Sequence, residues 1–141
     1  MPLVAASLFM VTACTDSPTA PTPSEDSPTG MEDAAVAATF TQVQKQIFDL
    51  MCVNCHGALS QAGLDLRSPQ SHSNLVNVTS SISVMVYVVP GNPDASCLIH
   101  KLDGRDGIIG SRMPQLGDPL PAELLELVRS WIQAGALDKL G

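Results

Sequence analysis

The segment CVNCHG, residues 52–57, constrains this chain more than any other. It places two thiols, Cys52 and Cys55, two residues apart, and the imidazole of His56 follows the second one directly. Such a group serves three different chemistries: a zinc site, a disulfide-exchange motif, and the covalent attachment of haem. Each chemistry needs different further residues or secondary structure elsewhere in the chain. The sequence outside this segment therefore indicates which of the three chemistries it serves.

The charge of the chain limits its partners. The 141 residues include 14 acidic side chains against 7 lysines and arginines, which gives a net charge of -7 at pH 7. Nucleic acid and anionic lipid both require clustered cations, so this balance argues against them and favours a protein partner with a basic docking face. The length suits one domain with its own core, and we expect a monomer.

The N-terminal segment predicts export. Residues 1–13 form an apolar run without charge, typical of the later part of a signal peptide, and Val11-Thr12-Ala13-Cys14 resembles the lipobox of bacterial lipoproteins. The basic start of such a signal is missing, so we expect a start codon upstream or a truncated sequence. The resemblance implies lipid attachment at Cys14 on the periplasmic side of a Gram-negative envelope, with the outer membrane favoured. A plain signal peptide or a short apolar strand remains the alternative.

A tether and one folded domain are predicted after this signal. Residues 14–35 are rich in Ser, Thr, Pro and acids and offer little to bury, which is typical of a disordered linker. Residues 36–141 then form the domain. No run of about 20 apolar residues predicts a membrane-spanning helix, so contact with a membrane is expected through the lipid alone.

A helix is predicted immediately before the two cysteines. Thr41 with Gln44 three residues later has the form of a capping box, so the helix is expected to begin near Thr41 and to deliver Cys52 and Cys55 at its C-terminal end. Its apolar residues recur at steps of three and four, and they predict this buried face: Phe40, Val43, Ile47, Leu50 and Met51.

The rest of the domain also predicts helices. Segments 93–102 and 121–134 each begin with proline and have a glycine just past their ends, at 104 and 135, and a shorter helix is expected from Pro69. Trp131 is predicted to pack against the first helix around Phe40. The apolar, β-branched segment 82–89 predicts an extended stretch or a small hairpin partner. These patterns indicate an all-α domain.

The three chemistries differ in what they need elsewhere in the chain. A structural zinc site needs four ligands, and the remaining donors His72, Cys97 and His100 offer only the last two at short spacing. A thioredoxin-like motif needs a βαβ context, whereas here a helix precedes the first cysteine. Covalent haem needs two thiols at this spacing and an adjacent histidine, which the segment provides in full. The sequence therefore favours haem.

Three further segments carry a family resemblance. AGLDL at 62–66, VVPGNPDASCLIHKLDG at 88–104 and RMPQLGDPLPAELLELVRSWIQAGA at 112–136 resemble the single-haem domains of planctomycete and myxobacterial secreted cytochromes, and the whole order looks like a class I c-type cytochrome. The resemblance implies a cytochrome c fold around one covalent haem c. It also implies His56 as proximal iron ligand, Met113 as distal ligand, and electron transfer rather than enzymatic turnover.

The residues support Met113 independently. A thioether fills the sixth position of haem iron and raises its potential, and Met113 lies in GSRMPQLG, a loop bounded by glycine and proline. Ligation by His100 is the rival reading. The other functions considered are a haem sensor or peroxidase-like enzyme with an open sixth position, and an electron-input domain of a larger redox complex.

Several supporting roles are also predicted. Gly57 is expected to allow close approach to the porphyrin, the Pro69 carbonyl to orient the His56 imidazole, and His72 to be exposed. Cys97 is expected to be a buried apolar residue. The candidate cavity walls are Leu64, Leu66, Val89 and Leu116. The candidate partners of haem propionates are Arg67, Arg105 and Arg112.

Overall fold

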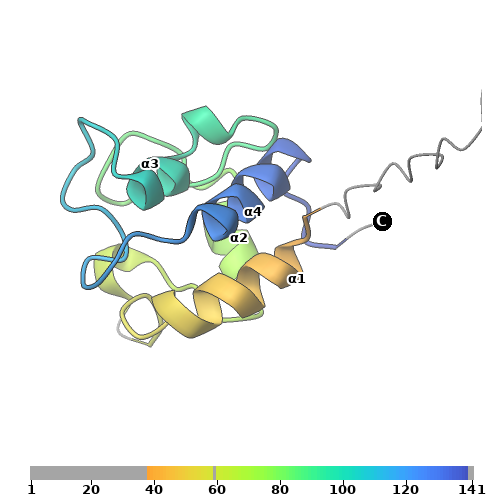
Figure 1. Cartoon of the computed structure of the whole chain (residues 1–141), viewed down its shortest axis with the longest axis horizontal. Helices are drawn as coiled ribbons and strands as arrows, with labels where there is room; N and C mark the ends of the chain where they lie inside the picture. Colours follow the sequence, from red (N-terminus) through yellow and green to blue (C-terminus); the bar gives the residue numbers. More distant parts are fainter. Residues whose placement is uncertain (1–37, 59, 140–141) are drawn as a thin grey trace, which may run out of the picture. The chain divides into compact units, whose positions relative to one another are not determined.

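Helices joined by long loops make up the part of the chain that the structure describes, residues 38–58 and 60–139 of a computed structural model (Figure 1). The predicted signal 1–13, Cys14 and the tether 14–35 lie outside the described residues. The helical elements follow in the order α1 Phe40–Val43, η1 Gln44–Cys52, η2 Gln61–Gly63, α2 Ser71–Leu75, η3 Pro93–Ala95, α3 Cys97–Asp103 and α4 Ala122–Gln133. The described residues contain no strand, so the all-α prediction holds at this level.

The first helix begins at Phe40 because its cap lies two residues before the predicted one. The Thr39 side chain accepts from the Gln42 backbone N–H at 3.2 Å, and the Gln42 side chain accepts from the Thr39 N–H at 2.9 Å. Gln44 is unable to cap because its side chain is buried, donating to the Leu66 carbonyl at 3.0 Å. The capping box predicted at Thr41 is therefore wrong.

After α1 the same helix continues as the π-helix η1, which changes the face that it buries. The Val53 N–H donates to the Phe48 carbonyl five residues back, at 3.0 Å. Each π turn contains more residues than an α turn, so the inward positions follow at steps of four and five. Phe48 is buried and Cys52 packs against the core, whereas Leu50 is 68% exposed. The prediction that Leu50 and Met51 are buried is wrong for this reason.

Helix α4 lies between α1 and α3 and contacts both (Figure 1). It begins directly after Pro121 and ends before Gly135, whose φ of 101° is readily adopted by glycine, so the predicted segment is confirmed. The Trp131 ring lies 5.1 Å from the Phe40 ring, centroid to centroid, which confirms the predicted contact. The indole N–H of Trp131 donates to the Leu137 carbonyl at 2.9 Å. One aromatic side chain thus joins α4, α1 and the C-terminal segment.

The segment 82–89 is extended only in its second half. Isolated bridges pair Val76 with Val88 and Thr79 with Val86, and these are the β contacts found among the described residues. The Val86 carbonyl then accepts from the Cys97 N–H at 2.9 Å, at the first turn of α3. The segment therefore satisfies free N–H groups of a helix instead of building a sheet.

The predicted helix 93–102 is present as two pieces, η3 and α3, separated at Ser96. The Asn92 side chain accepts from the Ala95 N–H at 3.1 Å, as predicted for its cap. Gly104 ends α3 with φ 73°. Among the described helices, none has the length and apolar character needed to cross a membrane.

Candidate haem-binding site

A tight turn at the end of η1 presents the three donors of the CVNCHG segment. The Cys52 carbonyl accepts from the Cys55 N–H at 3.1 Å and from the His56 N–H at 2.8 Å. Further along, the His56 carbonyl accepts from the Leu66 N–H at 2.7 Å. The turn is therefore held both by the helix that precedes it and by the loop that follows it.

Gly57 is required by the backbone of this turn. A Cβ on Gly57 would lie 2.2 Å from the Val53 carbonyl oxygen, which is closer than side-chain and backbone atoms approach in proteins. Since the blocking atom belongs to the chain's own backbone, the turn itself requires glycine here, and the role of Gly57 in approaching a porphyrin stays a prediction.

Gly57→Ala is expected to lower the free energy of unfolding by about 1–3 kcal/mol, the usual cost of overpacking. The added methyl group must push the Val53 peptide away, which strains the end of η1. A urea unfolding midpoint measured for both proteins checks this. An unchanged midpoint would show that Val53 and Gly57 are not in such close contact.

The His56 ring is held in one tautomer. Its Nδ1 lies 3.0 Å from the Gln61 carbonyl oxygen, and a carbonyl only accepts, so Nδ1 carries the proton. The lone pair is then on Nε2. A carbonyl on the second ring nitrogen is the usual arrangement of a metal-bound histidine. The predicted orienting carbonyl, that of Pro69, is wrong, because the loop folds back to the ring five residues after His56.

Two adjoining hollows, together called the central cavity here, meet at the CVNCHG segment. The outer hollow has a volume of about 720 Å³ and the inner one about 80 Å³. Cys55 lines the outer hollow, and Cys52, His56 and Met113 line both. The central cavity therefore brings together the four predicted haem-binding residues, although Met113 lies more than fifty positions further along the chain than the cysteines.

The wall of the central cavity is largely apolar. Of the predicted wall residues, Leu64 and Leu66 line its inner hollow, and Leu116 lies at the outer one with 87% of its surface exposed. Val89 lines neither hollow, so that prediction is wrong; its backbone N–H donates to the Ser96 hydroxyl at 2.9 Å. The wall residues that sequence patterns did not identify include Phe48, Ile82, Tyr87, Leu98 and Leu102.

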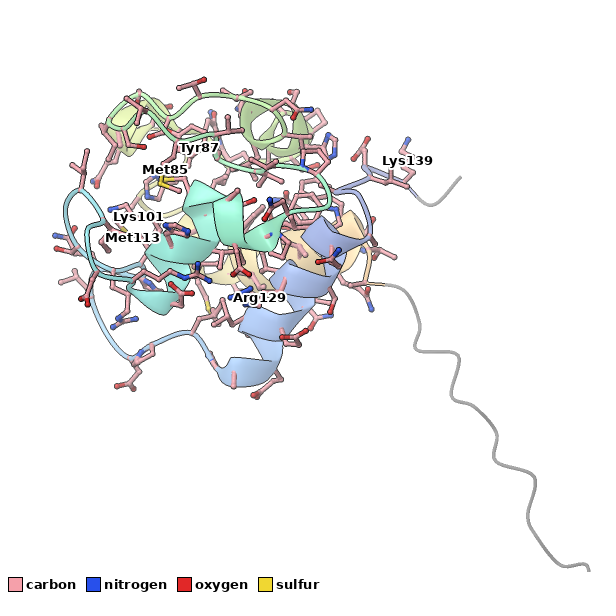
Figure 2. The ribbon with its side chains drawn as sticks, turned by 90° about the horizontal axis from the view of Figure 1, so that it is seen from above. Met85, Tyr87, Lys101, Met113, Arg129 and Lys139 are labelled. Carbon is pink, nitrogen blue, oxygen red and sulfur yellow. The ribbon has the colours of Figure 1, made fainter. Side chains whose placement is uncertain are left out.

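Met113 is half-buried at the edge of the α3 C-terminal loop. Its backbone N–H donates to the Lys101 carbonyl at 2.7 Å, and Figure 2 shows the two side by side. The loop is thus tied to α3 beside the thioether. This bond explains how an irregular segment is held at a cavity whose other donors come from the end of η1 and the turn that follows it.

The thiol of Cys52 is not suited to disulfide exchange. Burial, and to a lesser extent the neighbouring Cys55, raises the pKa of Cys52 to about 11. Exchange motifs instead lower the pKa of the attacking thiol to about 3.5–7.5. Both cysteines are free thiols. At neutral pH Cys52 is therefore protonated and weakly nucleophilic in this fold.

The rival ligand, His100, is engaged elsewhere. Its Nε2 lies 2.7 Å from the Asp94 carbonyl oxygen and so carries the proton in that bond. The side chain lines a third hollow, which shares Lys101 with the central cavity but is not lined by His56 or Met113. Its surroundings favour the role of a link between α3 and η3.

His72 and Cys97 have structural partners. The predicted exposure of His72 is wrong: it is half-buried, its Nε2 donates to the Ala136 carbonyl at 2.7 Å, and its ring lies 4.9 Å from that of Phe40. Cys97 is buried, as predicted. Nowhere in residues 38–58 and 60–139 do three His, Cys, Asp or Glu side chains gather as a metal-ion cluster.

None of the three predicted propionate partners lines the central cavity. Arg67 pairs with Asp65, and it lowers the pKa of that carboxyl to about 2. Arg105 bridges Asp94 and Asp103, at 2.6 and 2.9 Å. Each of these two guanidinium groups therefore neutralises carboxylates of the chain itself.

Arg112 points its Nη2 at the Gly117 carbonyl, 3.4 Å away, and its side chain packs over Gly104. Lys101 is instead the cationic side chain found at the cavity among the described residues. No sequence pattern marked Lys101, because its role depends on where the loop after α3 folds back.

No protein-family model, curated protein or solved structure matches this chain.

Proposed function

We propose that this chain is an electron carrier with one covalent haem c and a class I-like cytochrome c fold. The observation that carries the proposal is the meeting of Cys52, Cys55, His56 and Met113 at one cavity. Two thiols, an imidazole and a thioether are the complete set of side-chain groups that a histidine–methionine c-type haem requires. The helical architecture of the domain is compatible with this fold.

The residues at the cavity fit such a group. Cys52 and Cys55 are free to form thioethers, and the His56 ring, oriented by the Gln61 carbonyl, keeps Nε2 for iron. The central cavity has apolar walls and opens to solvent on the side of Leu116. A flat, mostly apolar macrocycle with two polar groups suits a cavity of this character.

The haem, when bound, would supply an iron that takes up and releases one electron. The chain's own residues would set how readily this happens. His56 and Met113 would keep the coordination unchanged, which minimises movement between oxidation states. Leu64, Leu66 and Tyr87 would keep water from the iron, and such an apolar shell tunes the potential.

Charge and the N-terminal sequence support a partner and a location for the proposed carrier. An acidic protein of net charge -7 is steered toward a partner with a basic face. We extend the proposal to a lipid on Cys14, which would hold the domain on the periplasmic side of the envelope at the end of its tether. This order suits a carrier that moves between membrane and periplasmic redox proteins.

An optical spectrum tests the proposal first. The chain, expressed with haem-attachment machinery, is expected to retain haem after acid–acetone extraction, to be six-coordinate and low-spin, and not to take up carbon monoxide. Cys52→Ser with Cys55→Ser is expected to lose nearly all extraction-resistant haem, because thioether formation needs these thiols. Cys97→Ser, a buried thiol of the same cavity, is the matched control and should retain haem. A high-spin spectrum with rapid carbon monoxide binding would instead favour a sensor or enzyme.

A further inference from the structure

Lys101 makes three hydrogen bonds to the loop that carries Met113. Its Nζ donates to the Ile109 carbonyl at 2.7 Å and to the Ser111 carbonyl at 2.9 Å. Its backbone carbonyl accepts from the Met113 N–H at 2.7 Å. The bonds reach every second residue of the loop, and Figure 2 shows Lys101 next to Met113. One residue of α3 thus holds the loop from Ile109 to Met113.

Besides these bonds and the packing of Arg112 over Gly104, the loop has few restraints. Ile109 is 56% exposed, Gly110 and Ser111 are exposed, and Leu116 beyond Met113 is 87% exposed. Burial of apolar surface therefore contributes little to the position of this segment. Hydrogen bonds from an ammonium group are stronger than neutral ones, so the Lys101 side chain is the main restraint on the loop before Met113.

The location of Lys101 connects this restraint to the cavity. Its side chain is half-buried and lines both hollows of the central cavity together with Met113 and His56. A lysine side chain without a partner in the protein extends its ammonium group into water, because its stem is long and flexible. Here the stem of Lys101 lines the cavity wall, and its ammonium group donates to the carbonyls of Ile109 and Ser111.

We propose that Lys101 is the positioning residue for Met113, a clamp that keeps the loop closed over the central cavity and slows the departure of the thioether. The proposal rests on the proposed function, in which Met113 ligates the iron. Loss of the ammonium would leave the loop tied by its backbone bond and by the packing of Arg112 over Gly104. The loop would then open more often, and external ligands would reach the sixth position more readily.

Lys101→Met tests the clamp, because methionine retains an unbranched stem of similar length and removes the charged donors. Lys101→Arg keeps donors, and Lys45→Met makes the same change at an exposed position on η1. The probe is imidazole titrated into the oxidised holoprotein. Lys101→Met loses two charged hydrogen bonds, and the loss of one such bond alone corresponds to about a tenfold change. We therefore expect at least about tenfold tighter imidazole binding in Lys101→Met and less than about threefold change in the two controls.

Amide hydrogen exchange at Met113 separates the clamp from the haem proposal. We expect about tenfold faster exchange of the Met113 N–H in Lys101→Met. Unchanged exchange would overturn the clamp, and so would unchanged imidazole affinity in a protein whose spectrum depends on Met113. If exchange is faster but the wild-type spectrum is independent of Met113, the clamp stands and the axial ligand proposal fails. Lys101→Gln, too short to reach both carbonyls, gives the same comparison if Lys101→Met does not fold.

Discussion

Met113→Ala is expected to open the sixth coordination position of the holoprotein. The methionine-to-iron charge-transfer absorption should disappear, carbon monoxide should bind the reduced protein, and the midpoint potential should fall by on the order of 0.1–0.3 V, a part of the roughly 0.8 V range that axial ligands span. The physical reason is that a thioether favours ferrous iron, and alanine has no donor to replace it. Optical titration against redox mediators measures both the spectrum and the potential.

Met85→Ala is the matched control, because Met85 is also half-buried but does not line the central cavity. Its spectrum and potential should remain close to those of the unmodified protein. His100→Ala distinguishes the rival ligand. If that variant loses the six-coordinate spectrum while Met113→Ala keeps it, His100 is the sixth ligand, and its bond to the Asp94 carbonyl must break when haem is bound.

The donors of the site were accessible to sequence analysis because each belongs to a short motif. Cys52, Cys55 and His56 lie in one segment, CVNCH, and their spacing together with the predicted helix before them favoured the proposed haem attachment. Met113 required the further argument that iron needs a second axial ligand. The structure adds what no motif contains, namely that residues from η1 and from the loop after α3 share a cavity.

The details around the donors were not predictable in the same way. The helical period of 3.6 residues predicted that Leu50 is buried, and the π-helix η1 instead turned Phe48 and Cys52 inward. The same patterns could not identify the Gln61 carbonyl as the partner of the His56 ring. Such a bond depends on the path of a loop, which short-range periodicity does not describe.

The partners of the charged side chains were also not predictable from sequence patterns. The guanidinium of Arg67 was predicted to pair with a haem propionate, but it forms an ion pair with Asp65, two positions away in the chain. Lys101, which no motif marked, contacts the loop of Met113 through two carbonyls. Charge and residue type indicate what a side chain could bind, whereas the fold decides which partner is within reach.

Trp131→Ala is expected to lower the free energy of unfolding by about 3–5 kcal/mol, the usual cost of truncating a buried aromatic side chain. Trp131 is 1% exposed, and its ring contacts that of Phe40 on α1. The change would leave a cavity between α4 and α1 and remove the indole bond to the Leu137 carbonyl. Urea unfolding of the holoprotein, followed by far-ultraviolet circular dichroism, measures the loss.

Trp131→Phe separates the two contributions, because phenylalanine keeps an aromatic ring against Phe40 and loses only the N–H donor and part of the volume. Its cost should be smaller than that of Trp131→Ala by at least about 1 kcal/mol. Equal costs would show that the bond to Leu137, and not the packing on α1, dominates. Because α1 continues into η1, which ends at Cys52, a loosened Phe40 contact should also weaken the helix that presents the thiols of the proposed haem site.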